Sequence, residues 1–354
     1  MKKKEIMSPT ASQQSLMKDL RQIIDQARGH VATTANYAMT MMYWHIGERI
    51  NREILGNQRA EYGKQIVAPV VRQLQEEYGS KGFEERNIRR MMQFAQMFPN
   101  YQILSTLLTK LSWSHFLIVM SLKDELKREF YITMAASERW SVRTLKDKID
   151  SMLFERTAIA GKPEELIRNE LSTLRNEEVM SPDLVFKSPY FLDFTGLKGV
   201  YDEKSLEDCL VANLERFIIE LGTGFSFVAR QKRIIIDGED FYLDLLFYHR
   251  RLHRLVAIDL KRGHFKAEYK GKMELYLRWL EKYEMEPGEE TPIGLLLCTE
   301  GGDEQIELLQ LDKTGIKVAQ YMTELPPREV LMNHIQKSLA EAKAKFDNNI
   351  AEVE

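Results

Sequence analysis

Cysteine is scarce in this sequence, which contains Cys209 and Cys298 and no others among its 354 residues. Both lie in apolar segments, and their spacing fits neither a disulfide framework nor a zinc site, so we expect buried structural thiols. No run of about 18 apolar residues suggests a membrane span. The first residues, MKKKEIM, are not followed by the apolar segment of a signal peptide. We therefore expect a cytoplasmic protein that does not contact a membrane.

Several common enzyme signatures are also missing. The sequence contains no P-loop, no glycine-rich nucleotide loop, no Ser/His/Asp order and no internal repeat. Its net charge of −3 is small, but the segment 225–272 holds 11 Lys and Arg against 6 Asp and Glu. This local excess of positive charge favours a phosphate-rich partner such as nucleic acid, although ordinary charge mixing on a surface would also produce it.

Two apolar, strand-like segments within this basic region each contain an acidic residue. FYLDLLFYH carries Asp244, and LVAIDLK carries Asp259 with Lys261 two positions later. Successive side chains of a strand point to opposite faces, so Asp259 and Lys261 share one face. The intervening RRLHR favours a hairpin, and we expect His249 and His253 on its surface. If the two aspartates pair on the same face, two carboxylates and one ammonium group converge.

A buried carboxylate in an apolar strand costs several kcal/mol when nothing compensates its charge. A divalent cation would remove that cost, and aspartate oxygens suit Mg²⁺ or Mn²⁺. The arrangement is that of a metal-dependent phosphodiesterase site. The alternative is structural, with Asp259 and Lys261 solvated on an edge strand and Asp244 in a buried ion pair, because an acid-x-Lys motif alone is a weak signal.

The order of the surrounding elements indicates a mixed fold. A helix over 205–221 is expected to place Glu207 and Glu215 on one face. Three strands follow it, and Gln231 lies on the first of them. The remaining expected elements are a helix over 264–286 and strands over 293–298 and 316–322. The resulting order is αβββαβ.

These segments resemble the YhcG-type family of PD-(D/E)XK nucleases. In the second half of the chain the resemblance rests on SPYFLDFTGL, IIELGTGFSFVARQ, FYLDLLFYHRRLHRLVAIDLK, GHFKAEYKGKMELYL and TPIGLLLCTE. In the first half it rests on FEERNIRRMMQFAQMFP, WSHFLIVMSL and REFYITMAASERWSVRTLKDKID. It covers almost the whole chain. It implies an α+β protein with a helical, winged-helix-like N-terminal domain and an αβββαβ restriction-endonuclease-like (PD-(D/E)XK) core.

The expected boundaries combine this resemblance with the local pattern, because a charged, partly helical connection precedes the core and a helical pattern follows Pro326. They are a helical N-terminal domain over 10–155, a linker over 156–188, a nuclease domain over 189–325 and a C-terminal helical tail over 326–354. The tail either packs on the core or pairs between the subunits of a homo-oligomer.

The resemblance also implies roles for individual residues. Asp244 and Asp259 would bind Mg²⁺ or Mn²⁺, and Lys261 would orient the attacking water and steady the charge on the phosphate. Gln231 would approach the metal or the phosphate from the first strand. A first-helix glutamate often completes such sites, and Glu207 and Glu215 both qualify. Many relatives have Glu at the position of Asp259, so the metal preference of this chain can differ from theirs.

Basic and aromatic residues near the proposed site are candidates for nucleic-acid contacts. They flank the strands with the acids or lie in the next helix, and they are Lys232, Arg233, Arg262, Lys266, Tyr269 and Lys272. In the N-terminal half, a helix over 83–98 places Arg86, Arg89 and Arg90 outside. It could be the recognition helix of a helix-turn-helix, or its basic face could be solvated or face an oligomer partner.

The sequence therefore predicts a magnesium-dependent endonuclease that hydrolyses phosphodiester bonds in nucleic acid, with DNA favoured. One alternative is a nucleic-acid-binding module that retains the fold without turnover. The other is a structural subunit that uses its helical parts to recruit a partner.

Overall fold

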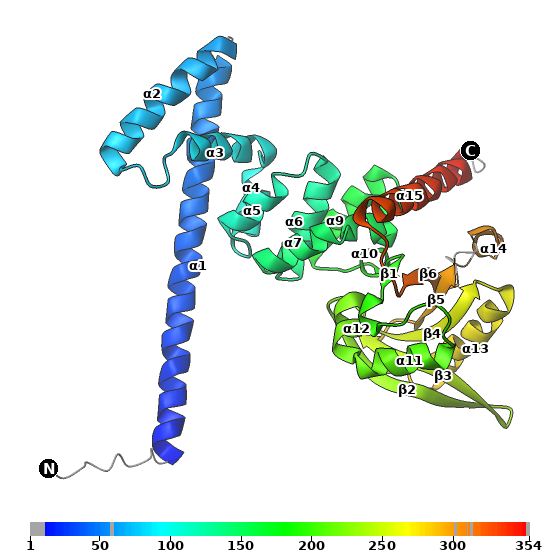
Figure 1. Cartoon of the computed structure of the whole chain (residues 1–354). Helices are drawn as coiled ribbons and strands as arrows, with labels where there is room; N and C mark the ends of the chain where they lie inside the picture. The colour runs from blue at the N-terminus through cyan, green and yellow to red at the C-terminus, as the bar shows by residue number, and fades with distance from the viewer. Residues whose placement is uncertain (1–10, 57–59, 301–302, 310, 312–313, 352–354) are drawn as a thin grey trace. The chain divides into compact units, whose positions relative to one another are not determined.

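The computed structural model of the protein describes residues 11–56, 60–300, 303–309, 311 and 314–351. They form two compact units that divide between Lys146 and Asp147, the first helical and the second built around a sheet (Figure 1). The MKKKEIM start, the first residue of the expected N-terminal domain and the end of the expected tail lie outside the described residues. Among the described residues, no helix is both long and apolar enough to cross a membrane.

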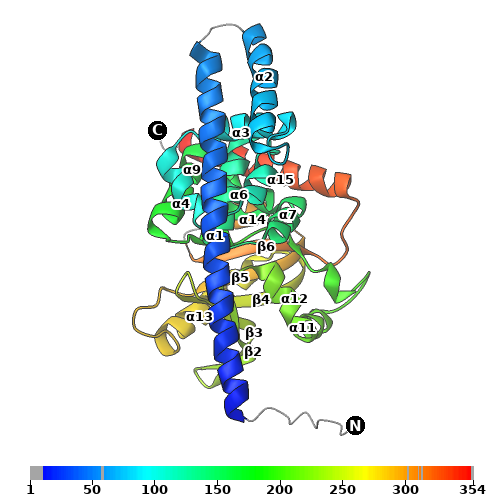
Figure 2. The same cartoon turned by 90° about the vertical axis from the view of Figure 1, so that its left-hand side faces the viewer.

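The first unit is built from helices around the long helix α1. Helix α2 packs against α1 and runs back along its end (Figure 2). At the crossing of α1 and α3, a Cβ atom on Gly47 would overlap the carbonyl oxygen of Met91, so only glycine allows this approach. The helices are α1 (Ala11–Gly56), α2 (Ala60–Tyr78), α3 (Glu85–Met97), α4 (Tyr101–Leu108), α5 (Trp113–Val119), α6 (Glu125–Ser137) and α7 (Val142–Asp150), which crosses into the second unit.

Helix α3 matches the helix expected over 83–98. Its buried face includes Ile88, Met91, Phe94 and Ala95, which follow the helical period. The helical character of this region is confirmed. The described residues of the first unit contain no strand, so the wing of a winged helix is not seen in them.

The second unit contains a six-stranded sheet in the order β1-β6-β5-β4-β3-β2. Strands β2, β3 and β4 are antiparallel neighbours, and β4, β5, β6 and β1 pair in parallel. The expected αβββαβ core is confirmed.

The strands of the second unit are β1 (Tyr190–Phe191), β2 (Phe225–Ile236), β3 (Glu239–His249), β4 (Arg254–His264), β5 (Ile293–Glu300) and β6 (Ile316–Met322). Its helices are α8 (Leu153–Arg156), η1 (Ala158–Gly161), α9 (Glu164–Glu177), α10 (Pro182–Val185), η2 (Asp193–Thr195), α11 (Glu203–Ala212), α12 (Leu214–Leu221), α13 (Ala267–Tyr283), α14 (Asp303–Leu308) and α15 (Arg328–Ala351).

Helices cover both faces of the sheet. On one face, the ring of Phe217 from α12 lies 5.9 Å from that of Phe247. On the other face, Leu246 and Ala257 share a buried cluster with Tyr276 of α13. Adjacent strand residues point to opposite faces, so α12 and α13 lie on opposite sides of the sheet, as both views suggest (Figures 1 and 2).

The helix expected over 205–221 is divided into α11 and α12. Asn213 stands between them with a non-helical backbone (φ −114°, ψ 36°), and both its backbone N–H and its side chain donate to the carbonyl of Cys209. Helix α11 also begins earlier than expected, because Asp202 caps it by accepting from the backbone N–H of Ser205 at 2.7 Å. As a result, Glu215 lies on a different helix from Glu207.

The position of His249 differs from the expectation. His249 was expected on the hairpin surface, but it is fully buried and its Nδ1 accepts from the backbone N–H of Leu252 at 3.1 Å. Burial lowers the pKa of His249 to about 4. The ring of Phe225 packs against it, with the two ring centroids 4.7 Å apart. His253 is exposed, as expected.

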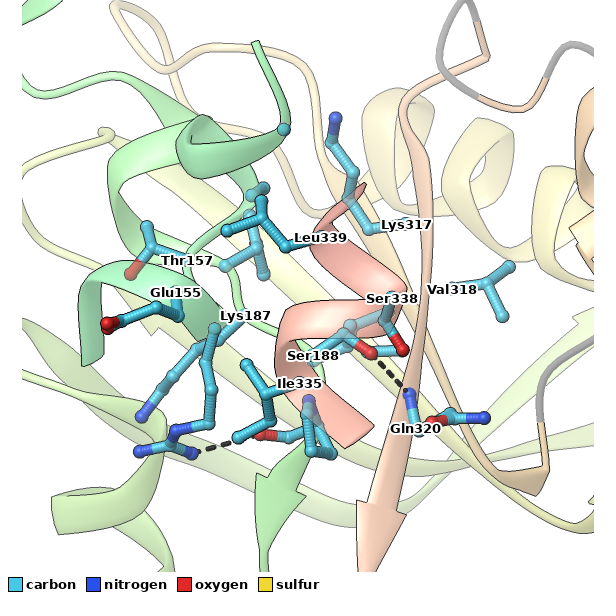
Figure 3. A pocket seen from close by; sticks show the side chains of 17 residues that line it. Glu155, Thr157, Lys187, Ser188, Lys317, Val318, Gln320, Ile335, Ser338 and Leu339 are labelled. Carbon is cyan, nitrogen blue, oxygen red and sulfur yellow. Dashed lines mark hydrogen bonds between the residues drawn. The ribbon is translucent and has the colours of Figure 1, made fainter. Parts of the chain in front are cut away.

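The segment 156–188, expected as a linker, is folded into the second unit. Arg156 donates to Glu220 at 2.7 Å, and the buried ammonium group of Lys187 lies 3.5 Å from the same carboxylate. A cavity of about 240 Å³ lies between the segment 155–161, β6 and α15 (Figure 3). Arg156 and Lys187 thus tie the two ends of this segment to Glu220 of α12.

The C-terminal helix α15 packs on its own unit. Leu331 and Ile335 are buried in a cluster with Met152 and Phe191. Of the two roles expected for the tail, packing on the core is the one that these contacts support.

Candidate functional site

Three polar side chains stand in a row across β2, β3 and β4. Leu245 pairs with Ile258, so the next step of the same register places Asp244 opposite Asp259. On the other side of β3, Gln231 lies between two residues that pair with the neighbours of Asp244. Its Nε2 donates to Asp244 Oδ1 at 3.2 Å. The register therefore aligns the predicted residues, and their expected arrangement on one side of the sheet is present.

Glu207 joins this row from helix α11. Gln231 Nε2 donates to Glu207 Oε2 at 2.6 Å, and Arg230 forms an ion pair with Glu207 Oε1. Glu207 is buried, whereas Glu215 is exposed on α12. Of the two glutamates that the sequence left open, the structure brings Glu207 to the group and leaves Glu215 outside it.

Lys261 lies beside the second aspartate. Its Nζ is 2.6 Å from Asp259 Oδ2 and donates to the carbonyl of Leu260 at 3.0 Å. Glu203 of α11 contributes a further carboxylate oxygen 3.6 Å from the same Nζ. Burial alone would lower the pKa of Lys261, but the charge and hydrogen bond of Asp259 outweigh it and the pKa is raised. The ammonium group therefore stays charged at neutral pH.

The two aspartates oppose each other electrostatically. Burial, followed by the charge of Asp259, raises the pKa of Asp244 to about 6. A hydrogen bond from the backbone N–H of Leu260 to Asp244 Oδ2, at 2.8 Å, acts in the opposite direction. Near neutral pH the pair therefore carries a negative charge that the fold compensates only in part.

The donor set fits a hard divalent cation that keeps much of its water shell. Asp259 Oδ1 is buried and accepts no hydrogen bond from the described part of the chain, and Lys272 Nζ lies 3.9 Å from it. No three Asp, Glu, His or Cys side chains within the described ranges are grouped as a complete metal cage. Mg²⁺ is typically bound by one or two carboxylates together with waters and substrate phosphates. Asp244 and Asp259 fit the part of the carboxylates.

A distortion in β4 sets the position of the residues after Lys261. The pairing of β4 with β5 shifts between Lys261 and His264, and Gly263 has a φ of +87° that favours glycine. Thr299 Oγ1 accepts from the N–H of Gly263 at 2.7 Å. Glu203 Oε1 accepts from the N–H of Arg262 at 3.0 Å.

Sequence reasoning missed Glu203 and Thr299. An acid in the first turn of a helix is usually read as a favourable partner of the helix dipole, and nothing in the local sequence connects Glu203 to a lysine 58 positions later. Thr299 lies near the end of the apolar strand β5 and carries no separate signal.

The predicted nucleic-acid contacts near the site fall into two groups. Lys266 and Arg262 are exposed beside the site, and the ring of Tyr269 lies 5.4 Å from Lys261 Nζ. Lys232 instead forms an ion pair with Glu284 at 2.7 Å. Arg233 is similarly paired with Asp240 at 2.8 Å. Lys272 belongs with the first group, because its Nζ lies 3.9 Å from Asp259 Oδ1. Lys266 has an acidic neighbour of its own, Glu268 at 3.8 Å. The acidic partner of Lys232 lies at the end of α13, and that of Arg233 lies on the same hairpin.

Comparison with known proteins gives two family matches. The DUF1016 N-terminal domain matches residues 19–156, and the YhcG PDDEXK nuclease domain matches residues 183–340. The protein named "Putative nuclease YhcG" from Escherichia coli (strain K12) is 31% identical over 363 residues, which cover 94% of this chain and 96% of that protein.

Solved structures give partial matches. A repair endonuclease from Pyrococcus abyssi is 22% identical with a TM-score of 0.25, covering 37% of this chain and 50% of that one. A complex of EndoMS with double-stranded DNA is 17% identical with a TM-score of 0.27, covering 36% and 49%. The chain thus spans about half the length of each of these solved structures.

Proposed function

We propose, from the premise that the chain belongs to the YhcG family of PD-(D/E)XK nucleases, that it uses a divalent cation to hydrolyse phosphodiester bonds in nucleic acid. To the family assignment this adds dependence on Mg²⁺ or Mn²⁺, a preference for DNA and cleavage within the strand.

The grouping of Asp244, Asp259 and Lys261 carries this proposal. Two adjacent carboxylates with a shared excess of negative charge suit a cation, and a charged lysine beside them suits a phosphate. Purely structural ion pairing would leave neither the raised pKa of Asp244 nor a buried Asp259 oxygen that accepts no hydrogen bond within the described residues.

Asp244 and Asp259 would hold the cation through their carboxylate oxygens. When bound, such a cation supplies Lewis-acid chemistry that activates water and neutralises phosphate charge. Gln231 orients Asp244 and Glu207 by donating to both. Lys261 donates a hydrogen bond to the attacking water or to a phosphate oxygen, where negative charge develops in the transition state.

The proposal is tested with purified full-length protein on closed circular DNA, which an exonuclease cannot attack. Linear duplex DNA, single-stranded DNA and RNA are compared in parallel, each with Mg²⁺, Mn²⁺ or a chelator. Cation-dependent nicking that is lost in both Asp259→Asn and Lys261→Met supports the site. If Asp259→Asn cleaves as fast as wild type, the group of Asp244, Asp259 and Lys261 is not the active site.

A binding measurement on the same polymers separates the enzyme from a binding module. A wild-type protein that binds the polymers with either cation but cleaves none of them would assign the fold a binding role.

A further inference from the structure

The three arginines of helix α3 do not share one environment. Arg89 forms an exposed ion pair with Glu85, one turn earlier on the same helix, at 2.6 Å. Arg90 instead lines a groove within the first unit, together with Lys123 and Arg128 from the region where α6 begins. We call it the α3–α6 groove. It has a volume of about 510 Å³ and includes Gln93 among its lining residues.

The lining of the α3–α6 groove has one sign of charge. Three of its residues are cations and none is Asp or Glu. The nearby Asp124 is engaged in capping α6, where its Oδ1 accepts from the backbone N–H of Lys127 at 3.0 Å. The remaining lining residues are neutral, so an anion in the groove would meet cations without a competing carboxylate in the lining.

One of these cations is held in a fixed orientation. Arg128 Nη1 donates to the carbonyls of Leu122 and Lys123 at 2.8 and 2.9 Å. A guanidinium group has five N–H donors, so this anchoring leaves others available for a ligand. A positioned guanidinium matches the geometry of phosphate oxygens better than a freely rotating one.

We propose that the α3–α6 groove binds the phosphate backbone of nucleic acid, so that the first unit contributes substrate affinity to the nuclease. This rests on the proposed function, because it identifies the same polymer as the ligand. Contacts from Lys and Arg to phosphate hold a nucleic acid without reading its bases. The groove therefore supplies affinity that does not depend on sequence, and Arg90 takes part whereas Arg89 does not.

The test measures binding of a labelled DNA duplex to the full-length protein in chelator, where cleavage plays no part. The variant is Arg90→Gln combined with Lys123→Gln, and Arg128 is kept because it holds the loop. The matched control is Arg86→Gln combined with Arg89→Gln, which removes two positive charges from the same helix outside the groove. Thermal melting of each variant checks that the fold is retained.

The groove variant should weaken binding, and the plot of log affinity against log salt should lose about 1.8 from its slope, or 0.9 for each phosphate contact. The control should bind like wild type. Equal losses in both variants, or none in the groove variant, would overturn the proposal. Unchanged duplex binding would be expected if the groove instead served an acidic protein.

Cleavage by the same variants in Mn²⁺ separates this proposal from the nuclease assignment. If the groove variant binds and cuts like wild type, the groove has no such role and the nuclease assignment stands. If wild type neither binds nor cuts any polymer, both proposals fail.

Discussion

At the scale of single residues, the negative charges of the two aspartates are compensated only in part by neighbouring groups. Asp244 is partly buried and stands opposite Asp259 in the sheet, and both features raise its pKa. Its ionised form therefore costs folding free energy near neutral pH when no cation is present.

Replacing Asp244 with asparagine should separate stability from activity. Without metal, Asp244→Asn should be more stable than wild type by about 1 kcal/mol at neutral pH, because a destabilising charge is lost. The asparagine side-chain oxygen can still accept the hydrogen bond from the backbone N–H of Leu260. Cleavage should fall by at least about 100-fold, since a proposed metal ligand is removed. Chemical denaturation and initial rates measure the two effects, and a less stable variant would contradict the charge argument.

Metal binding should depend on pH through the same carboxylate. A raised pKa of about 6 means that Asp244 gains a proton as the pH falls through that value, and a protonated carboxyl binds a cation poorly. The stabilisation by Mn²⁺ should therefore be full above about pH 7 and fade toward about pH 5. Melting temperatures with Mn²⁺ and with chelator across this range provide the measurement. A stabilisation that stays constant with pH would exclude Asp244 as a ligand.

At the scale of elements, the first turn of α11 holds the end of β4. Glu203 accepts from the backbone N–H of Arg262 at 3.0 Å and lies 3.6 Å from Lys261 Nζ. It reaches two consecutive residues of a strand just before the register shift. We therefore expect Glu203 to hold Lys261 in position.

Two substitutions at Glu203 distinguish its charge from its hydrogen bond. Glu203→Gln keeps an acceptor for Arg262 and should lose little activity. Glu203→Ala removes it, and we expect the maximal rate to fall about tenfold, which corresponds to one ordinary hydrogen bond, with little change in KM. Faster amide hydrogen exchange at Arg262 in the alanine variant would show that the strand end has loosened. Equal rates for both variants and wild type would remove Glu203 from the site.

At the scale of the whole molecule, the chain divides into two units with separate cores. Each unit should therefore respond to damage in its own core. Two helical glycines allow the two units to be compared. Gly47 lies at the tight crossing of α1 and α3, whereas Gly271 lies on the exposed side of α13.

Gly47→Ala should destabilise the first unit by about 2 kcal/mol, because the new methyl group overlaps the backbone of α3. Gly271→Ala meets no neighbour within 4 Å and should stabilise α13 by about 0.5 to 1 kcal/mol. In thermal unfolding, the transition that shifts with Mn²⁺ should move with Gly271→Ala and not with Gly47→Ala. Movement of that transition in both variants would show that the two units unfold together.

Local sequence patterns predict most of the elements, and the resemblance of long segments predicts the nuclease family. Apolar periodicity predicts α3, the hairpin of β3 and β4, and β6, because the period of a pattern is a local property. The alternation of strand side chains predicts that Asp259 and Lys261 face the same way, and their contact at 2.6 Å agrees. Long family-like segments predicted the nuclease core.

Which distant residues meet depends on how the elements pack. Glu207 and Glu215 are indistinguishable by spacing, but the helix breaks at Asn213 and, of the two, Glu207 is the one that reaches Gln231. Glu203 reaches Lys261 because α11 packs against β4, a contact between segments 58 positions apart in the chain. Periodicity depends on residues that are close in the sequence. Burial, ion pairing and the pKa of Asp244 depend on packing between residues that are distant in the sequence.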